Sequence, residues 1–586
     1  MVFHPPAWVP QLPIDPPDSV TIEQFMTSEK FGRSPLVESR NPFTCGLTGK
    51  TRSWVDLVRR ADFLARALGK RLGWQPNQGT PWDKVVAVFS LNSIDYIPAL
   101  YAIHRFSGIA TPANAAYSAA ELQHQLVSSG TQAVFTCLPL LETALTATRA
   151  IGIPDENVFL LDFPALTPDA QQAAADVGKV HSTVDQLIDE GSALPRLEPL
   201  RWTEGQGARQ PAFLCYSSGT SGLPKAVMIS HRNVIANVLQ IASSESVGRE
   251  KKGIRTQVVI GLLPFSHIYG LVVVAHSTTF RGDEVIVLPK FELESFLATI
   301  QRFRVEMLHI VPPILVRLMQ TQDICSKYDL SSIRFFYCGA APIGEETIDE
   351  LKRFYPHWVI GQGYGMTETS TVVCSTSEHD IFTRSSGSLV QGAKAKIIDF
   401  DGKEVSSYDT PGELYVQSPS VVLGYLNNEK ASAETFVNHD DGRWIRTGDE
   451  VIVTKAPSGN EHIIIVDRIK ELIKVKGHQV APAELEAHLL THPAVADAAV
   501  IQIPDDNAGE VPKAFVVKAD GYASKSDEEL ARSIARHVEE HKASYKWLKG
   551  GVEFIDEIPK TPSGKILRRL LRDQEKAKRK KAGSKL

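Results

Sequence analysis

Residues 213–233 read FLCYSSGTSGLPKAVMISHRN, two apolar runs joined by a loop of glycine and hydroxyl side chains. The first run, 213–216, predicts a buried strand, and the second, 226–229, predicts another. Ser230 is suited to the N-cap of a following helix, because its hydroxyl can accept a backbone N–H of the first turn. The stretch therefore predicts a strand, a loop, a strand and a helix in that order.

The loop between the two strands has the chemistry of an anion-binding site. Its backbone N–H groups and hydroxyls can converge on one anion, and the lysine adds positive charge, so polyphosphate is the expected ligand. The spacing differs from a Walker loop, and a strand instead of a helix follows the lysine. The competing interpretation is a hairpin turn with an exposed lysine. The candidate residues are Ser217, Ser218, Gly219, Thr220, Ser221, Gly222 and Lys225.

A second string, at residues 361–368, reads GQGYGMTE. The aromatic face of Tyr364 suits a purine, and the carboxylate of Glu368 suits a hard cation such as Mg²⁺ that also binds phosphate. Alone, the string could be a turn with an exposed acid. The joint occurrence of this string and the Ser217–Lys225 loop favours a nucleotide site.

Together these strings resemble the signatures of the acyl-adenylate-forming superfamily. That superfamily contains acyl-CoA synthetases, 4-coumarate–CoA ligases, firefly luciferase and the adenylation domains of peptide synthetases. The resemblance covers roughly residues 20–572 through five ordered motifs. One departure is Ala226, where many members carry glycine, and it adds only a methyl group.

The resemblance implies a set of nucleotide contacts. Tyr364 would stack on adenine, Thr367 would contact the α-phosphate, and Glu368 would help to hold Mg²⁺. Asp449, otherwise a turn carboxylate, would accept the two ribose hydroxyls of ATP. The remaining implied contacts are Gly339, Ala340, Ala341, Gly363 and Arg468.

The resemblance also implies that the C-terminal region moves between two half-reactions. Lys565 would bridge the substrate carboxylate and the α-phosphate during adenylation, and Lys470 would lie at the pivot. His267 would lie beside the substrate carboxylate, although a histidine among apolar residues is more often a packed core residue. The residues implied in transfer to coenzyme A are Lys474, Gln479, Lys476 and Gly477.

The implied chemistry begins with attack of a carboxylate on the α-phosphorus of MgATP, which gives acyl-AMP and pyrophosphate. Both reactants are anionic, so cations at Lys565, at Glu368 through Mg²⁺ and in the Ser217–Lys225 loop are needed to offset the repulsion. The small domain then rotates, and the thiol of coenzyme A attacks the acyl carbonyl and expels AMP. ATP, Mg²⁺ and coenzyme A are therefore the expected cofactors.

The substrate pocket of the superfamily maps onto a largely apolar set of positions. Val272 stands where plant hydroxycinnamate ligases usually have asparagine, and Tyr337 stands where they usually have lysine. Both changes weaken the pairing offered to a phenolic hydroxyl, so we expect an aryl-alkyl, cinnamate-like or medium-chain fatty acid. The mapped positions are Ile268, Tyr269, Val272, Tyr337, Gly339, Gly363, Thr371, Val372 and Val373.

Two alternative functions use the same motifs. A luciferase-like oxygenase shares them, and nothing in the sequence selects it. An adenylating enzyme that loads a carrier protein is also compatible, although the sequence has no fused carrier or condensation region.

The order of predicted strands and helices predicts an α/β fold with more than one domain. From residue 83 apolar strands alternate with helices, which is typical of a parallel, helix-flanked sheet. Short strands and turns over 387–467 predict a β-rich subdomain within an N-terminal domain of residues 1–467. Residues 468–573 predict a mobile α+β C-terminal domain, and residues 574–586 form a basic tail.

Composition narrows the functional classes. The 586 residues carry a net charge of −5, so the chain lacks the overall basic charge of a nucleic-acid-binding protein. The six cysteines are scattered, and we expect them to be reduced core residues. The uncharged run 256–280 predicts a buried strand and helix in place of a transmembrane segment, because Pro264, Ser266 and Gly270 interrupt it.

The chain ends in Ser584, Lys585 and Leu586, a tripeptide that acts as a peroxisomal targeting signal. We expect a peroxisomal protein whose tail binds the import receptor, and whose basic segment 576–581 keeps that signal accessible. Binding of the basic segment to an anionic membrane or to nucleic acid is the weaker interpretation.

Overall fold

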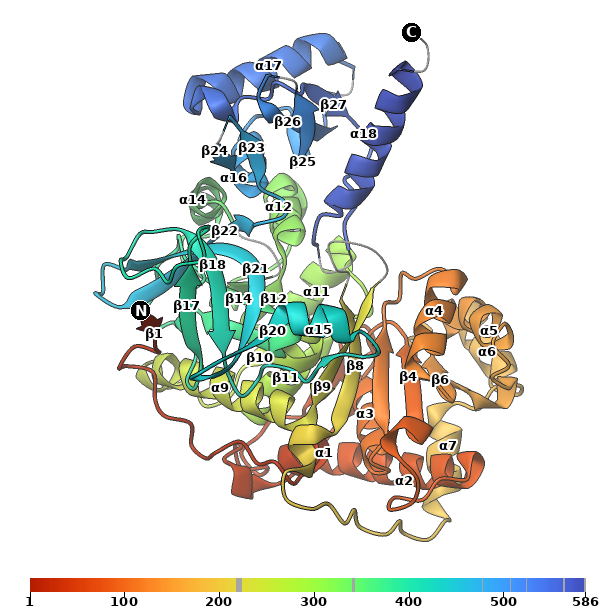
Figure 1. The fold of residues 1–586 in the computed structure, drawn as a ribbon. Coiled ribbons are helices and arrows are strands. Elements are labelled where there is room, and N and C mark those ends of the chain that lie inside the picture. Colours follow the sequence, from red (N-terminus) through yellow and green to blue (C-terminus); the bar gives the residue numbers. More distant parts are fainter. Residues whose placement is uncertain are drawn as a thin grey trace.

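The computed structural model describes residues 1–217, 224–339, 343–476, 478–505, 507–522, 524–561 and 564–583. The predicted α/β fold is confirmed: a large N-terminal domain carries three sheets, and a smaller C-terminal domain carries a fourth (Figure 1). Two sheets of the large domain, each with parallel strands at its centre, carry most of the candidate active site.

The larger sheet has nine strands in the order β16-β15-β14-β13-β12-β10-β11-β2-β3. Its centre is parallel, whereas β15 runs antiparallel to β14 and so reverses the chain at the second sequence motif. The strand bounds are β2 (Phe43–Cys45), β3 (Thr51–Arg52), β10 (Val258–Gly261), β11 (Glu284–Val287), β12 (Met307–Ile310), β13 (Phe335–Cys338), β14 (Val359–Met366), β15 (Thr371–Ser375) and β16 (Ser388–Leu389).

The second sheet has seven strands in the order β19-β9-β8-β5-β4-β6-β7. Its strand β4 and its neighbours β5 and β6 are parallel, and the predicted strand pair around the anion loop forms the antiparallel hairpin β8–β9. The bounds are β4 (Val85–Phe89), β5 (Ile109–Ala113), β6 (Ala133–Thr136), β7 (Val158–Leu160), β8 (Pro211–Ser217), β9 (Lys225–Ser230) and β19 (Gly424–Tyr425).

Helices cover these sheets, and their ends follow the local sequence. Helix α9 begins after Ser230, whose hydroxyl accepts the N–H of Asn233 at 3.1 Å, so the predicted N-cap is confirmed. The uncharged run 256–280 forms strand β10 and a buried π-helix, η5 (Tyr269–Ser277). The main helices are α1 (Ile22–Met26), α2 (Trp54–Leu72), α3 (Tyr96–His104), α4 (Ala119–Ser129), α5 (Leu141–Arg149), α6 (Pro168–Val177), α7 (Val184–Ser192), α8 (Gln206–Arg209), α9 (His231–Lys251), α11 (Leu293–Phe303), α12 (Pro312–Gln320) and α14 (Glu345–Phe354).

A third sheet forms a separate β-rich region of the large domain. Its order is β1-β17-β18-β21-β20, and β22 pairs with β21. The N-terminal strand joins this sheet through antiparallel pairing with β17, in which Phe3 lies opposite Ala395. The bounds are β1 (Val2–Phe3), β17 (Lys394–Ile398), β18 (Gly412–Gln417), β20 (Phe436–His439), β21 (Gly442–Lys455) and β22 (Glu461–Arg468).

The C-terminal domain has its own hydrophobic core, with residues between Ile473 and Leu571. Its sheet is ordered β24-β23-β26-β25, with β27 beside β26, and it lies above the large domain in Figure 1. Helix α18 continues to Gly583, so helical structure extends into the segment predicted as a tail. The bounds are β23 (Ile473–Val475), β24 (His478–Val480), β25 (Val495–Asp505), β26 (Gly509–Lys518), β27 (Val552–Phe554), α16 (Pro482–Leu489), α17 (Asp527–His541) and α18 (Arg568–Gly583).

The six cysteines are buried and form no disulfide, as predicted. Among the described parts of the chain, none of the helices is both long and apolar enough to cross a membrane.

Candidate active site

The ends of the predicted anion loop lie at the mouth of the β8–β9 hairpin. Ser217 and Lys225 are cross-strand partners there. The Ser217 hydroxyl donates to Oε1 of Glu368 at 3.1 Å, and the Lys225 ammonium lies 4.9 Å from the centre of the Tyr425 ring. Folding therefore joins the two sequence motifs directly. The other predicted loop residues, Ser218, Gly219, Thr220, Ser221 and Gly222, lie outside the described residues.

Tyr425 is a site residue that the sequence did not reveal. It lies on the short strand β19, which pairs with β9, and its hydroxyl donates to Oε1 of Glu368 at 2.9 Å. Burial and the Glu368 carboxylate raise the pKa of Tyr425, so the hydroxyl keeps its proton and remains a donor. A glycine-tyrosine pair in an apolar stretch has no distinctive pattern, so only the strand pairing could identify it.

Backbone strain is concentrated where β14 turns into β15. Ser370 and Thr371, which follow Glu368, have φ angles of 54° and 119°, values that residues with side chains rarely adopt. Hydrogen bonds hold them in place: Ser370 Oγ donates to the Ser420 carbonyl at 2.9 Å, and Thr371 Oγ1 donates to the Ile268 carbonyl at 3.1 Å. Thr367, the predicted α-phosphate contact, begins the single helical turn that precedes this strained segment.

Tyr364, Asp449 and Arg468, three of the predicted nucleotide contacts, lie together. The Tyr364 hydroxyl donates to Oδ2 of Asp449 at 2.5 Å, and Nε of Arg468 lies 3.7 Å from Oδ1. Asp449 and Arg468 are cross-strand partners in β21 and β22. Burial raises the pKa of Asp449 above its ordinary value, although Arg468 and the tyrosine hydroxyl act in the opposite direction.

Lys565 enters this group from the C-terminal domain. Its N–H donates to Thr561 Oγ1 at 3.1 Å, which closes a turn in which Gly564 has a φ of 83°. A Cβ at Gly564 would lie 3.2 Å from Val311 of the large domain, so the turn packs against the end of β12. Burial first, and then the charge of Arg468, lower the pKa of Lys565 to about 8, while Asp449 and Glu368 oppose this shift.

His267 lies near Lys565 in the loop between β10 and η5. Its Nδ1 accepts the N–H of Tyr269 at 3.3 Å, so Nε2 carries the proton in the neutral ring. Burial and the Lys565 charge lower the pKa of His267 to about 4. The residue is therefore a neutral hydrogen-bond donor at neutral pH.

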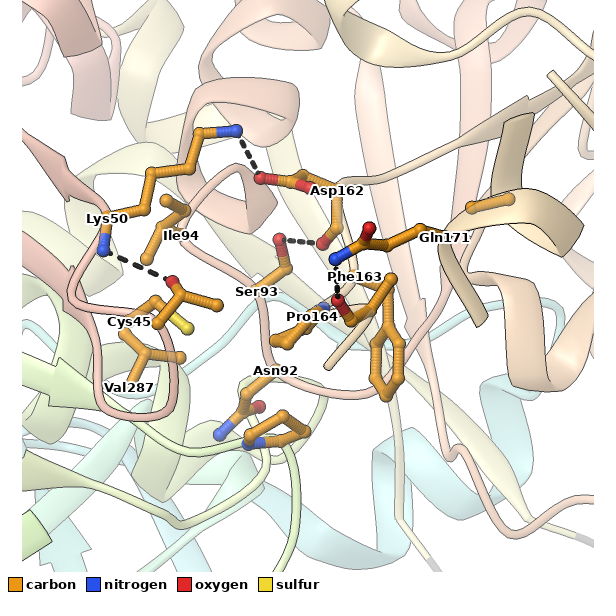
Figure 2. Close-up of a pocket in the computed structure, with 14 residues that line it drawn as sticks. Cys45, Lys50, Asn92, Ser93, Ile94, Asp162, Phe163, Pro164, Gln171 and Val287 are labelled. Atoms are coloured by element: carbon orange, nitrogen blue, oxygen red, sulfur yellow. Dashed lines mark hydrogen bonds and ion pairs between the residues drawn. The ribbon is translucent and has the colours of Figure 1, made fainter. Parts of the chain in front are cut away.

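Asn92 holds the loop that carries His267, a role for which there is no signal in the local sequence. Its Nδ2 donates to the Leu263 carbonyl at 2.9 Å, and its Oδ1 accepts the N–H of Phe265 at 2.8 Å. Asn92 also lines a cavity of about 330 Å³ at the carboxyl ends of β2, β4 and β11, where Lys50 pairs with Asp162 at 2.6 Å (Figure 2). A buried asparagine after a strand is common, so its position relative to His267 had to come from the fold.

The predicted acyl-pocket residues lie on or next to η5, β13, β14 and β15, and most of their side chains are apolar. Val272 and Val373 are buried, and the hydroxyls of the two tyrosines are directed to protein groups. Tyr337 Oη lies 2.7 Å from Ser375 Oγ, and Tyr269 Oη lies 3.3 Å from the Tyr337 carbonyl. The other buried members of the set are Ile268, Thr371 and Val372.

The predicted glycines of the pocket leave space for these tyrosines. A Cβ at Gly363 would lie 2.0 Å from Tyr337 Oη, and one at Gly339 would lie 2.9 Å from the Tyr269 ring. The absence of a side chain at both positions therefore leaves room for the two tyrosine side chains. Ala340 and Ala341 lie outside the described residues.

The residues predicted to serve transfer to coenzyme A lie apart from the Lys565 turn. Lys474 and Gln479 are cross-strand partners in β23 and β24, and their side chains are exposed, as is that of Lys476. Lys476 has a φ of 49°, and the next residue, Gly477, lies outside the described residues. Lys470 follows β22 and is exposed, between the two domains.

Comparisons with known proteins identify the family of the chain. A profile of AMP-binding enzymes matches residues 35–426, and a profile of the AMP-binding enzyme C-terminal domain matches residues 484–565. The acyl-CoA ligase cm3C of Cordyceps militaris is 39% identical over 588 residues, which cover 98% of this chain and 90% of cm3C. The acyl-CoA ligase AFT1-1 of Alternaria alternata is 40% identical over 583 residues, with 98% of each chain covered.

Solved structures share the fold. The ATP-bound RpMatB-BxBclM chimera B1 superposes with a TM-score of 0.75 at 26% identity, covering 95% of this chain and 99% of the chimera. The anthranilate CoA ligase AuaEII, solved with anthranoyl-AMP, has a TM-score of 0.77 at 23% identity, covering 95% of this chain and 98% of AuaEII, a likeness that concerns the fold alone. The chain is therefore an enzyme of the AMP-binding family, and it is classed with these acyl-CoA ligases as an acid–thiol ligase.

Proposed function

We propose that the protein activates an apolar carboxylic acid with MgATP and transfers the acyl group to coenzyme A, releasing pyrophosphate and AMP. One observation carries the proposal: Lys565 of the C-terminal domain lies in the same charged group as Asp449, Glu368 and His267 of the large domain. This group combines the cationic Lys565 with the two buried acids and the neutral donor His267. Such a combination fits the formation of an acyl-adenylate.

The proposal includes a set of nucleotide contacts that this geometry supports. Asp449, held by Tyr364, would accept the ribose hydroxyls, and the Tyr364 ring would face adenine. Thr367 and the Ser217–Lys225 loop would contact the phosphates, and Arg468 would add positive charge. The other residues that would line the nucleotide site are Gly339, Ala340, Ala341 and Gly363.

Glu368 fits a magnesium ligand. Ser217 and Tyr425 both donate to its Oε1, so these donors orient the carboxylate and we expect the cation at Oε2. Mg²⁺ bound there would offset the charge of the triphosphate.

For the reacting acid, Nε2–H of the neutral His267 would donate to one carboxylate oxygen. Protonated Lys565 would attract both the carboxylate and the α-phosphate, and it acts by its charge and not as a base. Rotation about Lys470 would then withdraw Lys565 and bring Lys474 and Gln479 to the site, with Lys476 and Gly477 along the pantetheine path. The hinge would separate an N-terminal domain of residues 1–467 from a C-terminal domain that begins at residue 468.

The proposed substrate class is supported by the apolar side chains at the predicted acyl positions. Val272 and Val373 offer no hydrogen bond, and the tyrosine hydroxyls are already directed to Ser375 and to a carbonyl. A polar group on the acyl tail would lose its hydration without gaining a partner, so aryl-alkyl, cinnamate-like or medium-chain acids are favoured. The proposed reaction is supported by relatives at about 40% identity that are named as acyl-CoA ligases of fungi.

The test is to incubate the purified protein with MgATP and a panel of carboxylic acids, with and without coenzyme A, and to follow AMP and thioester by mass spectrometry. AMP and acyl-CoA formed together would support the proposal. Acyl-AMP that accumulates in the presence of coenzyme A would contradict it and would indicate another acceptor, such as a carrier protein.

We also propose that the C-terminal tripeptide directs the enzyme to peroxisomes. Ser584, Lys585 and Leu586 lie outside the described residues, and they follow the basic helix α18. A fluorescent protein fused to the N-terminus should co-localise with a peroxisomal marker. The same fusion without the last three residues should not, and peroxisomal fluorescence that survives the deletion would reject this signal.

A further inference from the structure

Helix α16 of the C-terminal domain begins without a cap from its own sequence. The residue before it is Ala481, whose side chain cannot accept a hydrogen bond, and its first residue, Pro482, has no N–H group. Helices α4 and α9, by contrast, begin after serines whose hydroxyls accept a backbone N–H of the first turn. The N–H groups at the start of α16 therefore need an acceptor from elsewhere in the fold.

Asp467 of the large domain supplies that acceptor. Its Oδ2 accepts the N–H of Ala483, the second residue of α16, at 2.9 Å. The side chain of an ordinary N-cap residue makes the same bond, and a carboxylate also suits the positive end of the helix dipole. Asp467 lies near the end of β22, which contacts α16 at the junction of the two domains (Figure 1). The Asp467–Ala483 hydrogen bond is therefore an inter-domain cap.

The Asp467 side chain also depends on this bond. Asp467 is only 8% exposed, and its Oδ1 accepts the N–H of Arg468 at 2.7 Å. Burial raises the pKa of Asp467, whereas the charge of Arg568 and the two N–H groups oppose this shift. Loss of the Ala483 N–H would leave a buried carboxylate with one donor fewer, which is unfavourable. The inter-domain cap therefore stabilises both of its partners.

Arg568 connects the inter-domain cap to the turn that carries Lys565. It begins α18, shortly after Lys565, and its Nε and Nη2 donate to the carboxylate of Glu486 in α16 at 3.1 and 2.6 Å. Glu486 Oε1 also accepts the N–H of Val500 in β25 at 2.8 Å, so α16, β25 and the start of α18 form one connected block. Burial acts to lower the pKa of Arg568, but the charges of Glu486 and then Asp467 outweigh it and raise that pKa. Holding α16 against Asp467 therefore holds the block from which the Lys565 turn extends.

We propose that Asp467 is a positioning residue for adenylation: by capping α16 across the domain boundary, it favours the orientation in which Lys565 lies at the site. This inference rests on the domain rotation of the proposed function. Asp467 and Ala483 lie on opposite sides of the proposed hinge at Lys470, so rotation there moves α16 away and breaks the inter-domain cap. A bond that exists in only one of two orientations shifts the equilibrium toward that orientation.

The orientation of the C-terminal domain can be measured without an assay of activity. The six native cysteines are buried, so cysteines introduced at two exposed residues, Lys430 of α15 (Glu429–Thr435) and Glu529 of α17, can be spin-labelled selectively. Distances from double electron–electron resonance should show a second population that grows in Asp467→Ala. Asp467→Asn should retain most of the wild-type distribution, because its amide oxygen can accept the same N–H.

A second variant separates the capping of the helix from the positioning of the domain. Ala481 has the extended backbone of an N-cap residue, with a φ of −77° and a ψ of 118°, so Ala481→Ser gives α16 a cap of its own. Added to Asp467→Ala, this substitution should restore the melting temperature but not the domain orientation, because the new cap moves with the C-terminal domain. Restoration of both would mean that Asp467 acts only through the stability of α16, and it would overturn the proposal.

The two half-reactions provide an independent readout. Asp467→Ala should slow pyrophosphate release by roughly two- to thirtyfold, the range expected for loss of a helix cap, and should spare thioester formation from a preformed acyl-adenylate. Asp380→Asn is the matched control: Asp380 is a buried acid of the large domain that accepts Nδ2–H of Asn460 at 2.7 Å, and its loss should change neither the orientation nor the ratio of the two rates.

The distance measurement keeps this inference distinct from the proposed function. A shifted distribution in Asp467→Ala would support the inter-domain cap even if the enzyme transferred its acyl group to an acceptor other than coenzyme A. An unchanged distribution, or equal slowing of both half-reactions, would overturn the inference and leave the proposed ligase reaction intact.

Discussion

Lys474 and Gln479 are cross-strand partners in the β23–β24 hairpin, and both side chains are exposed. The turn that carries Lys565 instead packs against Val311 of the large domain, and Lys565 interacts with Arg468 and Asp449. The C-terminal domain therefore presents Lys565, and not the hairpin, to the site. This arrangement is the one required for adenylation in the proposed mechanism, and it lets the two half-reactions be tested separately.

Lys565→Ala is expected to slow formation of acyl-AMP by roughly 10²–10³-fold, because it removes a charge that stabilises the transferring phosphoryl group. Thioester formation from a preformed acyl-adenylate should stay near the wild-type rate. Assays stopped at fixed times measure pyrophosphate release for the adenylation step and acyl-CoA formation for the transfer step. Lys560→Ala is the control: it removes a lysine that lies beside the Lys565 turn and pairs with Asp497 at 2.6 Å, and it should affect neither step strongly.

The pH dependence of adenylation should report on Lys565. Its pKa is lowered to about 8, and only the charged form acts, so kcat/KM is expected to fall as the pH rises through about 8. Arginine keeps its charge to much higher pH, so Lys565→Arg should move this decrease upward even if the rate is lower. If kcat/KM falls at the same pH in the wild type and in Lys565→Arg, the decrease reports the titration of another group.

Lys474→Ala and Gln479→Ala are expected to spare adenylation and to slow transfer to coenzyme A. The side chains are exposed in the present arrangement, so their removal should leave the Lys565 site and the melting temperature nearly unchanged. Acyl-AMP should then accumulate during turnover, which mass spectrometry can detect. Equal losses in both half-reactions would contradict the rotation.

Tyr425→Phe is expected to lower kcat/KM for MgATP by roughly tenfold or more, because it removes a hydrogen bond to a buried carboxylate. The variant should also need more Mg²⁺ for half-maximal activity, since Glu368 is less firmly oriented. Tyr408→Phe is the matched control: it removes a tyrosine hydroxyl from Glu461, a pair 2.5 Å apart in the β-rich region. Equal effects of the two substitutions would mean that the change is one of general stability.

Gly363→Ala is expected to displace Tyr337, because the new Cβ would lie 2.0 Å from the tyrosine Oη. Overpacking of this kind costs about 1–3 kcal/mol of unfolding free energy, and activity toward the longest acids should fall most. Adding Tyr337→Phe removes the closest atom and should restore part of both losses. Calorimetry and kcat/KM across a chain-length series provide the measurements, and a double variant no better than the single one would contradict the contact.

Much of the fold could be predicted because it depends on local patterns. The apolar runs around the anion loop gave β8, β9 and the Ser230 cap, and the alternation from residue 83 gave the parallel strands. The uncharged run 256–280 was correctly divided into a strand and a helix, but not as a π-helix, since its hydrogen bonds depend on packing against α9.

Resemblance to the motifs of the acyl-adenylate-forming superfamily named Lys565, Asp449, Tyr364, Glu368 and His267, because each belongs to a string that matches one of those motifs. Tertiary structure decided which of them meet, and it added Tyr425 and Asn92, whose roles arise from strand pairing and a loop contact with no local signature. It also decided that Lys565 and the Lys474–Gln479 pair occupy different places, since a domain orientation is set by the whole interface. The charges at the site are fixed by residue type, but their pKa values and distances come from burial, which only the folded chain creates.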